Sequence, residues 1–120
     1  KGTIADVDGK FLIDAETDQP IAGYEGLSAD TEIDLSGIEA TRFNIRADIS
    51  GDGVESVVFS GSFSRTENVD PYALFGDRSG DYYGRDLAAG SYTVTATPYS
   101  KNRGKGAAGT PLTIELTIVE

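Results

Sequence analysis

The fold is decided by residues 91–119, which read SYTVTATPYSKNRGKGAAGTPLTIELTIV. In the last part, apolar side chains at positions 112, 114, 116 and 118 alternate with threonine and glutamate. A period of two is typical of a β-strand with one buried face. Tyr92, Val94 and Ala96 alternate with threonines in the same way, and the glycine-rich loop Ser100–Gly109 separates the two stretches. The segment therefore predicts a β-hairpin of two long strands.

The same alternation recurs upstream of this hairpin. Phe43–Ile49 and Val57–Phe63 each place apolar residues on one face. In Phe11–Ala15, the residues at 11, 13 and 15 alternate with Leu12 and Asp14. The side chains that the pattern assigns to the space between two sheets are Phe43, Ile45, Phe59, Tyr92, Val94, Leu112, Ile114 and Leu116.

Shorter strands are expected at Glu32–Leu35 and near Asp81–Gly84, and residues 36–40 allow at most one helical turn. Clusters of Gly, Asp, Asn and Pro separate all these segments. Six or seven short strands joined by turns predict an antiparallel β-sandwich. Residues 1–120 show no internal repeat and no linker, so we expect a single domain.

Composition excludes several classes of protein. The chain has a net charge of −10, which argues against nucleic-acid binding. It contains no His and no Cys, which removes the usual general base, nucleophile pairs and zinc ligands. Its apolar runs are too short for a membrane helix or a signal peptide. We therefore expect a monomeric, non-catalytic protein that requires no cofactor.

Four segments carry a resemblance to a known family: Val57–Phe59, Asn68–Tyr72, Ala89–Ala96 and Leu112–Val119. Over residues 43–119 the chain resembles the bacterial immunoglobulin-like (Big-type) modules of extracellular proteins. Pro71–Asp77 resembles a subtype found beside carbohydrate-active and malectin-like domains. The resemblance implies an antiparallel immunoglobulin-like β-sandwich of about seven strands.

What the resemblance implies about function is open among three alternatives. The first is a spacer or presenting module of a secreted or cell-surface bacterial multidomain enzyme or adhesin, whose partners are the neighbouring domains. The second is a carbohydrate-binding module for a polysaccharide, and the third is a calcium-stiffened adhesin repeat. Such modules serve all these roles on one fold.

Gly90 and Tyr92 predict a structural feature. Gly90 permits a sharp turn, and Tyr92 then opens the strand with its ring inward. Its hydroxyl is expected to reach a backbone group before the turn, as in a tyrosine corner.

The loop Phe75–Asp86 is the main candidate site, because it combines aromatic rings, arginines and carboxylates. Sugar rings stack on exposed tyrosine faces while polar neighbours bind their hydroxyls. The candidate carbohydrate-binding residues are Tyr82, Tyr83, Arg78, Arg85 and Asp81. Adjacent tyrosines in an extended stretch point to opposite faces, so at least one should be exposed.

The same loop could hold Ca²⁺, which prefers six to eight oxygen ligands. Its candidate metal ligands are Asp77, Asp81 and Asp86, and Asp6-Val7-Asp8-Gly9 is a weaker second candidate. Asp and Gly are also ordinary turn formers, which is the alternative interpretation.

Two further surfaces are candidate binding sites, and each can also be interpreted as ordinary solvated surface. The tip Ser100–Gly106 holds three of the ten basic residues and could bind carboxylated or sulfated glycans, or be a solvated loop. The row of Thr93, Thr95, Thr97, Thr113 and Thr117 is typical of a solvated strand surface.

Overall fold

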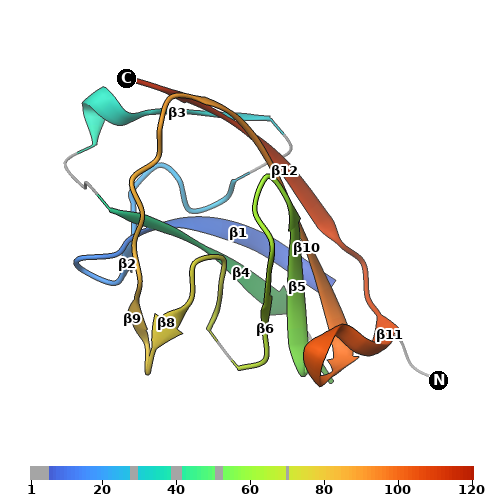
Figure 1. The fold of residues 1–120 in the computed structure, drawn as a ribbon. Coiled ribbons are helices and arrows are strands. Elements are labelled where there is room, and N and C mark those ends of the chain that lie inside the picture. The colour runs from blue at the N-terminus through green and yellow to red at the C-terminus, as the bar shows by residue number, and fades with distance from the viewer. Residues whose placement is uncertain (1–5, 28–29, 39–41, 51–52, 70) are drawn as a thin grey trace.

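The computed structural model describes residues 6–27, 30–38, 42–50, 53–69 and 71–120. Two facing β-sheets form the body (Figure 1). The first, sheet A, has the order β2-β1-β4-β7. Its strands are β1 (Asp6–Asp14), β2 (Gln19–Pro20), β4 (Phe43–Ser50) and β7 (Tyr72–Ala73).

Sheet B has the order β3-β12-β10-β5-β6, and β11 pairs with β10 beside this path. Its strands are β3 (Thr31–Asp34), β5 (Ser56–Gly61), β6 (Arg65–Glu67), β10 (Gly90–Lys101), β11 (Lys105–Ala108) and β12 (Leu112–Val119). A separate hairpin pairs β8 (Asp77–Arg78) with β9 (Asp81–Tyr82). The 3₁₀ helices are η1 (Leu35–Gly37) and η2 (Asn102–Gly104).

This arrangement is an immunoglobulin-like β-sandwich, as the sequence predicted. The chain crosses from sheet A to sheet B between β2 and β3, returns to sheet A in β4, and passes through sheet B again in β5 and β6 before β7. The predicted hairpin of β10 and β12 is present, with Val94 opposite Ile114. One pairing was not predicted: β3 runs parallel to β12, with Ile33 beside Ile118.

The core lies between the sheets and confirms most of the predicted side chains. Phe43 and Ile45 from sheet A pack with Phe59, Val94, Ile114 and Leu116 from sheet B, and all six are buried. Tyr92 and Leu112 were predicted to be buried but are half-buried at the edge of the core. They lie near the two ends of their paired stretch, where fewer side chains cover them.

The tyrosine corner is confirmed. The Tyr92 hydroxyl donates to the carbonyl oxygen of Ala88 at 2.8 Å. The Tyr92 ring stacks on Phe63, with 5.5 Å between centroids. This contact fixes the start of β10 at the corner where the chain enters sheet B.

One predicted helical turn is present in shortened form. η1 begins after Asp34, whose Oδ1 accepts from the Ser36 backbone N–H and hydroxyl. These hydrogen bonds hold the pKa of Asp34 below its usual value. Residues 39–40 of the predicted turn lie outside the described residues. None of the helices in the described ranges has the length and apolar character needed to span a membrane.

Candidate functional site

The candidate loop Phe75–Asp86, here the covering segment, lies against the outer face of sheet A. The connection from β7 to β10 carries it there, and Figure 1 shows its β8–β9 hairpin beside β2 and β4. Phe43 of β4 pairs with Arg85 in an isolated bridge, with hydrogen bonds of 2.8 and 2.9 Å. The segment is therefore fixed to a strand of the sandwich.

The Asn44 side chain holds the covering segment to sheet A through hydrogen bonds. Its Nδ2 donates to the carbonyl oxygens of Gly76 at 2.9 Å and Tyr83 at 2.7 Å. Its Oδ1 accepts from the backbone N–H groups of Ile45 and Phe75 at 2.8 and 3.0 Å. These contacts use both donors and both acceptor positions of the amide. The alternation placed Asn44 on a solvated face, but its exposed fraction is 0% because the covering segment lies over it.

Tyr82 is a buried residue of the covering segment, and its predicted role as an open stacking platform is corrected here. Its exposed fraction is 8%, and it forms a second apolar cluster with Ile13, Ala15 and Ala73. The Tyr82 backbone N–H donates to Asp18 Oδ1 at 2.9 Å. The ring therefore covers the outer face of sheet A and offers little surface to a sugar.

This second cluster also changes the interpretation of β1. The alternation gave Ile13 and Leu12 opposite faces, and both side chains are fully buried. Leu12 belongs to the core between the sheets, whereas Ile13 lies under Tyr82. Strand β1 thus has an apolar side chain on each face at this point, which its sequence shows as an uninterrupted apolar run, Phe11–Ile13.

The polar end of Tyr82 meets Arg46. Burial lowers the pKa of Arg46, but hydrogen bonds to Tyr82 and Asp48 outweigh it and raise the pKa overall. Arg46 Nε donates to Asp48 Oδ1 at 2.7 Å. The arginine therefore stays charged and its donors are engaged within the protein.

Gly84 is the point of closest approach between the covering segment and the sheet. A Cβ at this position would lie 2.6 Å from Ala15 Cβ and 2.7 Å from Arg42 Cβ. Arg42 also donates from Nη2 to the Gly84 carbonyl oxygen at 2.8 Å. Glycine at 84 serves packing of backbone on sheet, and not the approach of a ligand.

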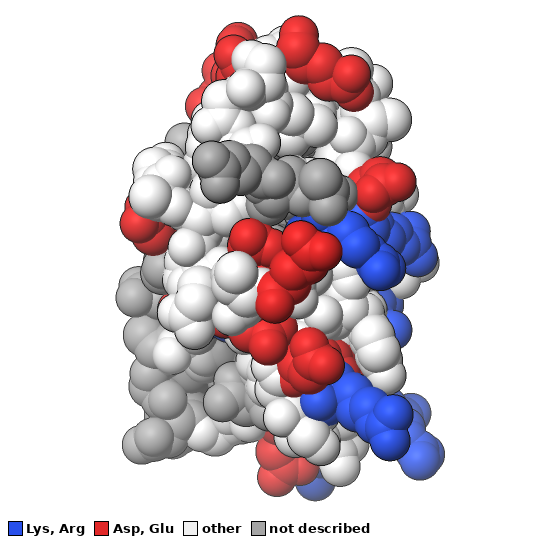
Figure 2. Space-filling model, turned by 90° about the vertical axis from the view of Figure 1, so that its left-hand side faces the viewer, with Lys and Arg blue, Asp and Glu red and all other residues white. Residues whose placement is uncertain are grey.

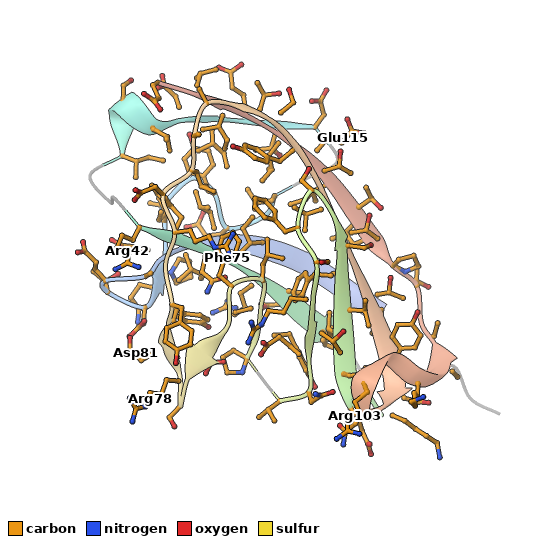
Figure 3. All side chains as sticks on the ribbon, viewed as in Figure 1. Arg42, Phe75, Arg78, Asp81, Arg103 and Glu115 are labelled. Atoms are coloured by element: carbon orange, nitrogen blue, oxygen red, sulfur yellow. The ribbon has the colours of Figure 1, made fainter. Side chains whose placement is uncertain are left out.

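The other predicted binding residues are separated. Tyr83 has an exposed fraction of 53% and points away from Tyr82, as the two-residue period required. Arg78 and Asp81 face each other at the hairpin, and both are exposed. Figure 3 shows Arg78 at the end of the hairpin, away from Phe75. Arg85 lies elsewhere, with its guanidinium carbon 4.7 Å from the centroid of the Phe75 ring.

The candidate calcium ligands of the covering segment are Asp77, Asp81 and Asp86. Asp77 Oδ2 accepts from the Gly80 backbone N–H at 2.7 Å, an ordinary turn contact. Asp81 and Asp86 are exposed. In the part of the chain that the structure describes, no group of three Asp, Glu, His or Cys side chains is placed to hold a metal ion. The structure gives no side-chain placement for Asp6 and Asp8. Calcium binding by these residues is therefore a question for the melting temperature measured with and without calcium.

Charge is unevenly distributed over the surface. Figure 2 shows separate acidic patches from the top to the bottom of the displayed face and basic side chains along its right-hand edge. The predicted basic tip includes Lys101, Arg103 and Lys105, all exposed around an open hollow of about 510 Å³. Its backbone is held, because Asn68 Oδ1 accepts from the Arg103 N–H at 2.7 Å and Ser56 Oγ accepts from the Gly104 N–H at 2.9 Å.

The sequence did not point to two other concave regions. One, of about 390 Å³, lies beside β2 and η1, with Ile21, Tyr24 and Ile38 among its lining residues. The other, of about 290 Å³, lies between the β5–β6 turn and the residues after β7, and includes Arg65 and Arg85. Arg65 carries no motif, and its position beside Arg85 depends on the tertiary fold.

Comparisons with known proteins add little. No protein-family model matches the chain, and a search of curated proteins finds no match. Among solved structures, it is similar to the fibronectin(III)-like modules of Clostridium thermocellum CbhA, with a TM-score of 0.43 and 12% identity over 92% of this chain and 47% of that chain. The chain thus spans about half the length of that neighbour, and a similarity this low carries no argument. Strand order and the tyrosine corner make the chain an immunoglobulin-like β-sandwich.

Proposed function

We propose that the chain is a non-catalytic accessory module that spaces and presents neighbouring domains of a secreted bacterial carbohydrate-active enzyme or adhesin. The observation that supports this most is the position of the first and last strands. β12 finishes at the top left of the molecule, whereas β1 begins on the right, behind β10 and β12 (Figure 1). The molecule measures 47 × 29 × 21 Å along its principal axes. Domains attached through these strands would be held apart.

The covering segment supports the same proposal. It is the part of the chain richest in the residue types that bind sugars or metals, and much of it is used in packing. Tyr82 is buried, Asn44 holds the backbone around Phe75 and Tyr83, and Gly84 lies directly on sheet A. A loop fastened at several points rigidifies the sandwich, which suits a spacer.

A distance measurement between the two ends tests the proposal. The chain has no cysteine, so spin labels can be attached to two introduced cysteines without background. We expect Asp6→Cys with Glu120→Cys to give one narrow distribution at a separation clearly longer than that of a cross-strand pair. A control pair at Thr93 and Glu115, which face each other on β10 and β12, should give a short distance. A short or very broad end-to-end distribution would contradict the spacer proposal.

Catalysis is tested separately with a panel of neutral, carboxylated and sulfated polysaccharides. We expect no release of reducing ends, because the chain lacks histidine and cysteine and because Asp81 and Asp86 of the covering segment are exposed to solvent. Reproducible turnover that is lost when the protein is unfolded would contradict the non-catalytic assignment.

A further inference from the structure

The concave region beside Phe75 has the features of a ligand site, and the spacer role does not use it. It has a volume of about 290 Å³. It is lined by residues 62–64 of the β5–β6 turn, by Arg65 at the start of β6, by Leu74 and Phe75, and by Arg85. We call it the arginine pocket, because Arg65 and Arg85 enter it from two distant parts of the chain.

Arg85 is held by stacking. Its guanidinium lies 4.7 Å from the centroid of the Phe75 ring, a distance typical of a cation–π contact. None of the carboxylates in the described ranges forms an ion pair with it, although the chain has twenty acidic and ten basic residues. Stacking leaves the N–H groups at the edge of a guanidinium free to bind an anion.

Arg65 is held by an ion pair on one edge. Its Nε donates to Glu67, a buried residue with an exposed fraction of 8%. Its Nη2 lies over Gly76, where a Cβ would come within 2.6 Å of that nitrogen. No acceptor among the described residues takes a hydrogen bond from its two terminal nitrogens. Arg65 thus has a fixed orientation and free donors.

The remaining walls add hydroxyls and a rigid apolar floor. Ser62 Oγ accepts from the Thr93 N–H at 2.9 Å, so its own hydrogen can be donated into the pocket. Ser64 lines the same pocket. Beneath them, the Phe63 ring meets Phe75 edge to face, with 5.2 Å between centroids. Because this floor continues through Phe63 to Tyr92, the pocket is pre-organised.

We propose that the arginine pocket binds the carboxylate of a uronic acid residue in an acidic polysaccharide. Two guanidinium groups match a planar carboxylate through paired N–H donors. The serine hydroxyls suit the hydroxyls of the sugar ring. The volume is at the small end for ligand pockets, so it suits one sugar ring and not a long segment of chain. This inference goes beyond the spacer role and does not depend on it.

Calorimetric titration of the full chain with digalacturonate tests the proposal, with uncharged galactobiose as the neutral probe. We expect saturable binding of digalacturonate and none of galactobiose at the same concentration. Arg85→Gln should weaken binding at least tenfold. The matched control is Arg78→Gln, which removes the same charge at the hairpin and away from Phe75 (Figure 3).

Arg65→Lys provides a second variant, since it keeps the charge near Glu67 and removes the forked donors. It should also weaken digalacturonate binding at least tenfold while leaving the melting temperature close to that of the wild type. Four results would overturn the proposal: no binding of digalacturonate at millimolar concentration, equal binding of galactobiose, equal losses in Arg78→Gln and Arg85→Gln, or binding of a sulfated disaccharide alone.

Discussion

The outer faces of the two sheets have similar sequence patterns, but the face of sheet B is exposed to solvent and that of sheet A is covered by another part of the chain. On sheet B, Thr93, Thr113 and Thr117 remain exposed, and Thr95 and Thr113 bond to each other through their hydroxyls at 2.9 Å. On sheet A, Asn44 occupies an equivalent alternating position and is fully buried beneath the covering segment. A polar residue at every second position therefore does not by itself establish that a face is in water.

The difference comes from what the side chains can do once covered. Each threonine in the row offers one hydroxyl on a short side chain. Asn44 offers two donors and two acceptors in one plane, so it can satisfy backbone groups of an overlying loop. A polar network that is fully satisfied fixes one arrangement, and its loss leaves buried groups without partners.

Replacing Asn44 by Ala should lower the free energy of unfolding by about 4 kcal/mol, since several buried backbone groups lose their partners at about 1–3 kcal/mol each. The control is Thr95→Ala on the bare face, where we expect a change of about 0.5 kcal/mol or less. Urea denaturation of both variants gives the comparison. Equal losses would show that the covering segment is not held by Asn44.

Replacing Tyr82 by Ala should lower the free energy of unfolding by about 3 kcal/mol, because a large buried ring leaves a cavity over Ile13 and Ala73. The adjacent Tyr83 is exposed, so Tyr83→Ala should change it by about 0.5 kcal/mol or less. Thermal and urea denaturation measure both. Equal losses of unfolding free energy in Tyr82→Ala and Tyr83→Ala would contradict the placement of the covering segment.

Replacing Gly84 by Ala should cost about 2 kcal/mol, because the added methyl group meets Ala15 and Arg42 and lifts the segment from the sheet. Gly37→Ala is the matched control, since a Cβ there has no neighbour within 4 Å. Hydrogen exchange of the Tyr82 and Tyr83 amides should be faster in Gly84→Ala alone. Unchanged protection in that variant would mean that the close approach is absent.

Replacing Tyr92 by Phe removes the hydrogen bond to Ala88 and should cost about 1 kcal/mol. The ring keeps its stacking on Phe63, so the loss isolates the hydroxyl. Tyr83→Phe, which alters an exposed ring, should be neutral in the same urea denaturation. A neutral Tyr92→Phe would leave the tyrosine corner without a stabilising role.

Calcium should have the smallest effect. We expect the melting temperature to be the same in millimolar calcium and in chelator, because Asp77 is already bonded to Gly80 and no group of three ligands forms among the described residues. A ligand that binds the folded state raises its melting temperature. A clear rise with calcium would restore the stiffened-repeat interpretation.

Sequence alone predicted the sandwich because its long strands show one buried face each. β10 and β12 are the clearest case, where alternation, matched lengths and a glycine-rich connection agree. Tyr92 was predicted with its partner region, since a tyrosine corner is a local feature. These signals lie within a few residues of the contacts that they describe.

The candidate site was predicted less well because its contacts are distant in sequence. Tyr82 and Tyr83 are adjacent and chemically identical, and what separates them is Ile13 and Ala15 beneath one ring. Arg85 was selected for its neighbours in the loop, whereas in the structure it lines a pocket together with Arg65 from the start of β6. No pattern in the local sequence predicts that these two arginines line the same pocket.

The strand order has a consequence for chains that carry many such modules. The outermost strands of the two sheets are β2, β7, β3 and β6, and each spans at most four residues. An unpaired edge is a template on which another polypeptide can extend the sheet, and a short edge gives it few hydrogen bonds to gain. Identical modules joined in series reach high local concentrations, where intermolecular β-sheet growth competes with correct folding. Short outer strands limit the hydrogen bonds that such growth can gain along β2, β3, β6 and β7, although β2 pairs with only two residues of β1.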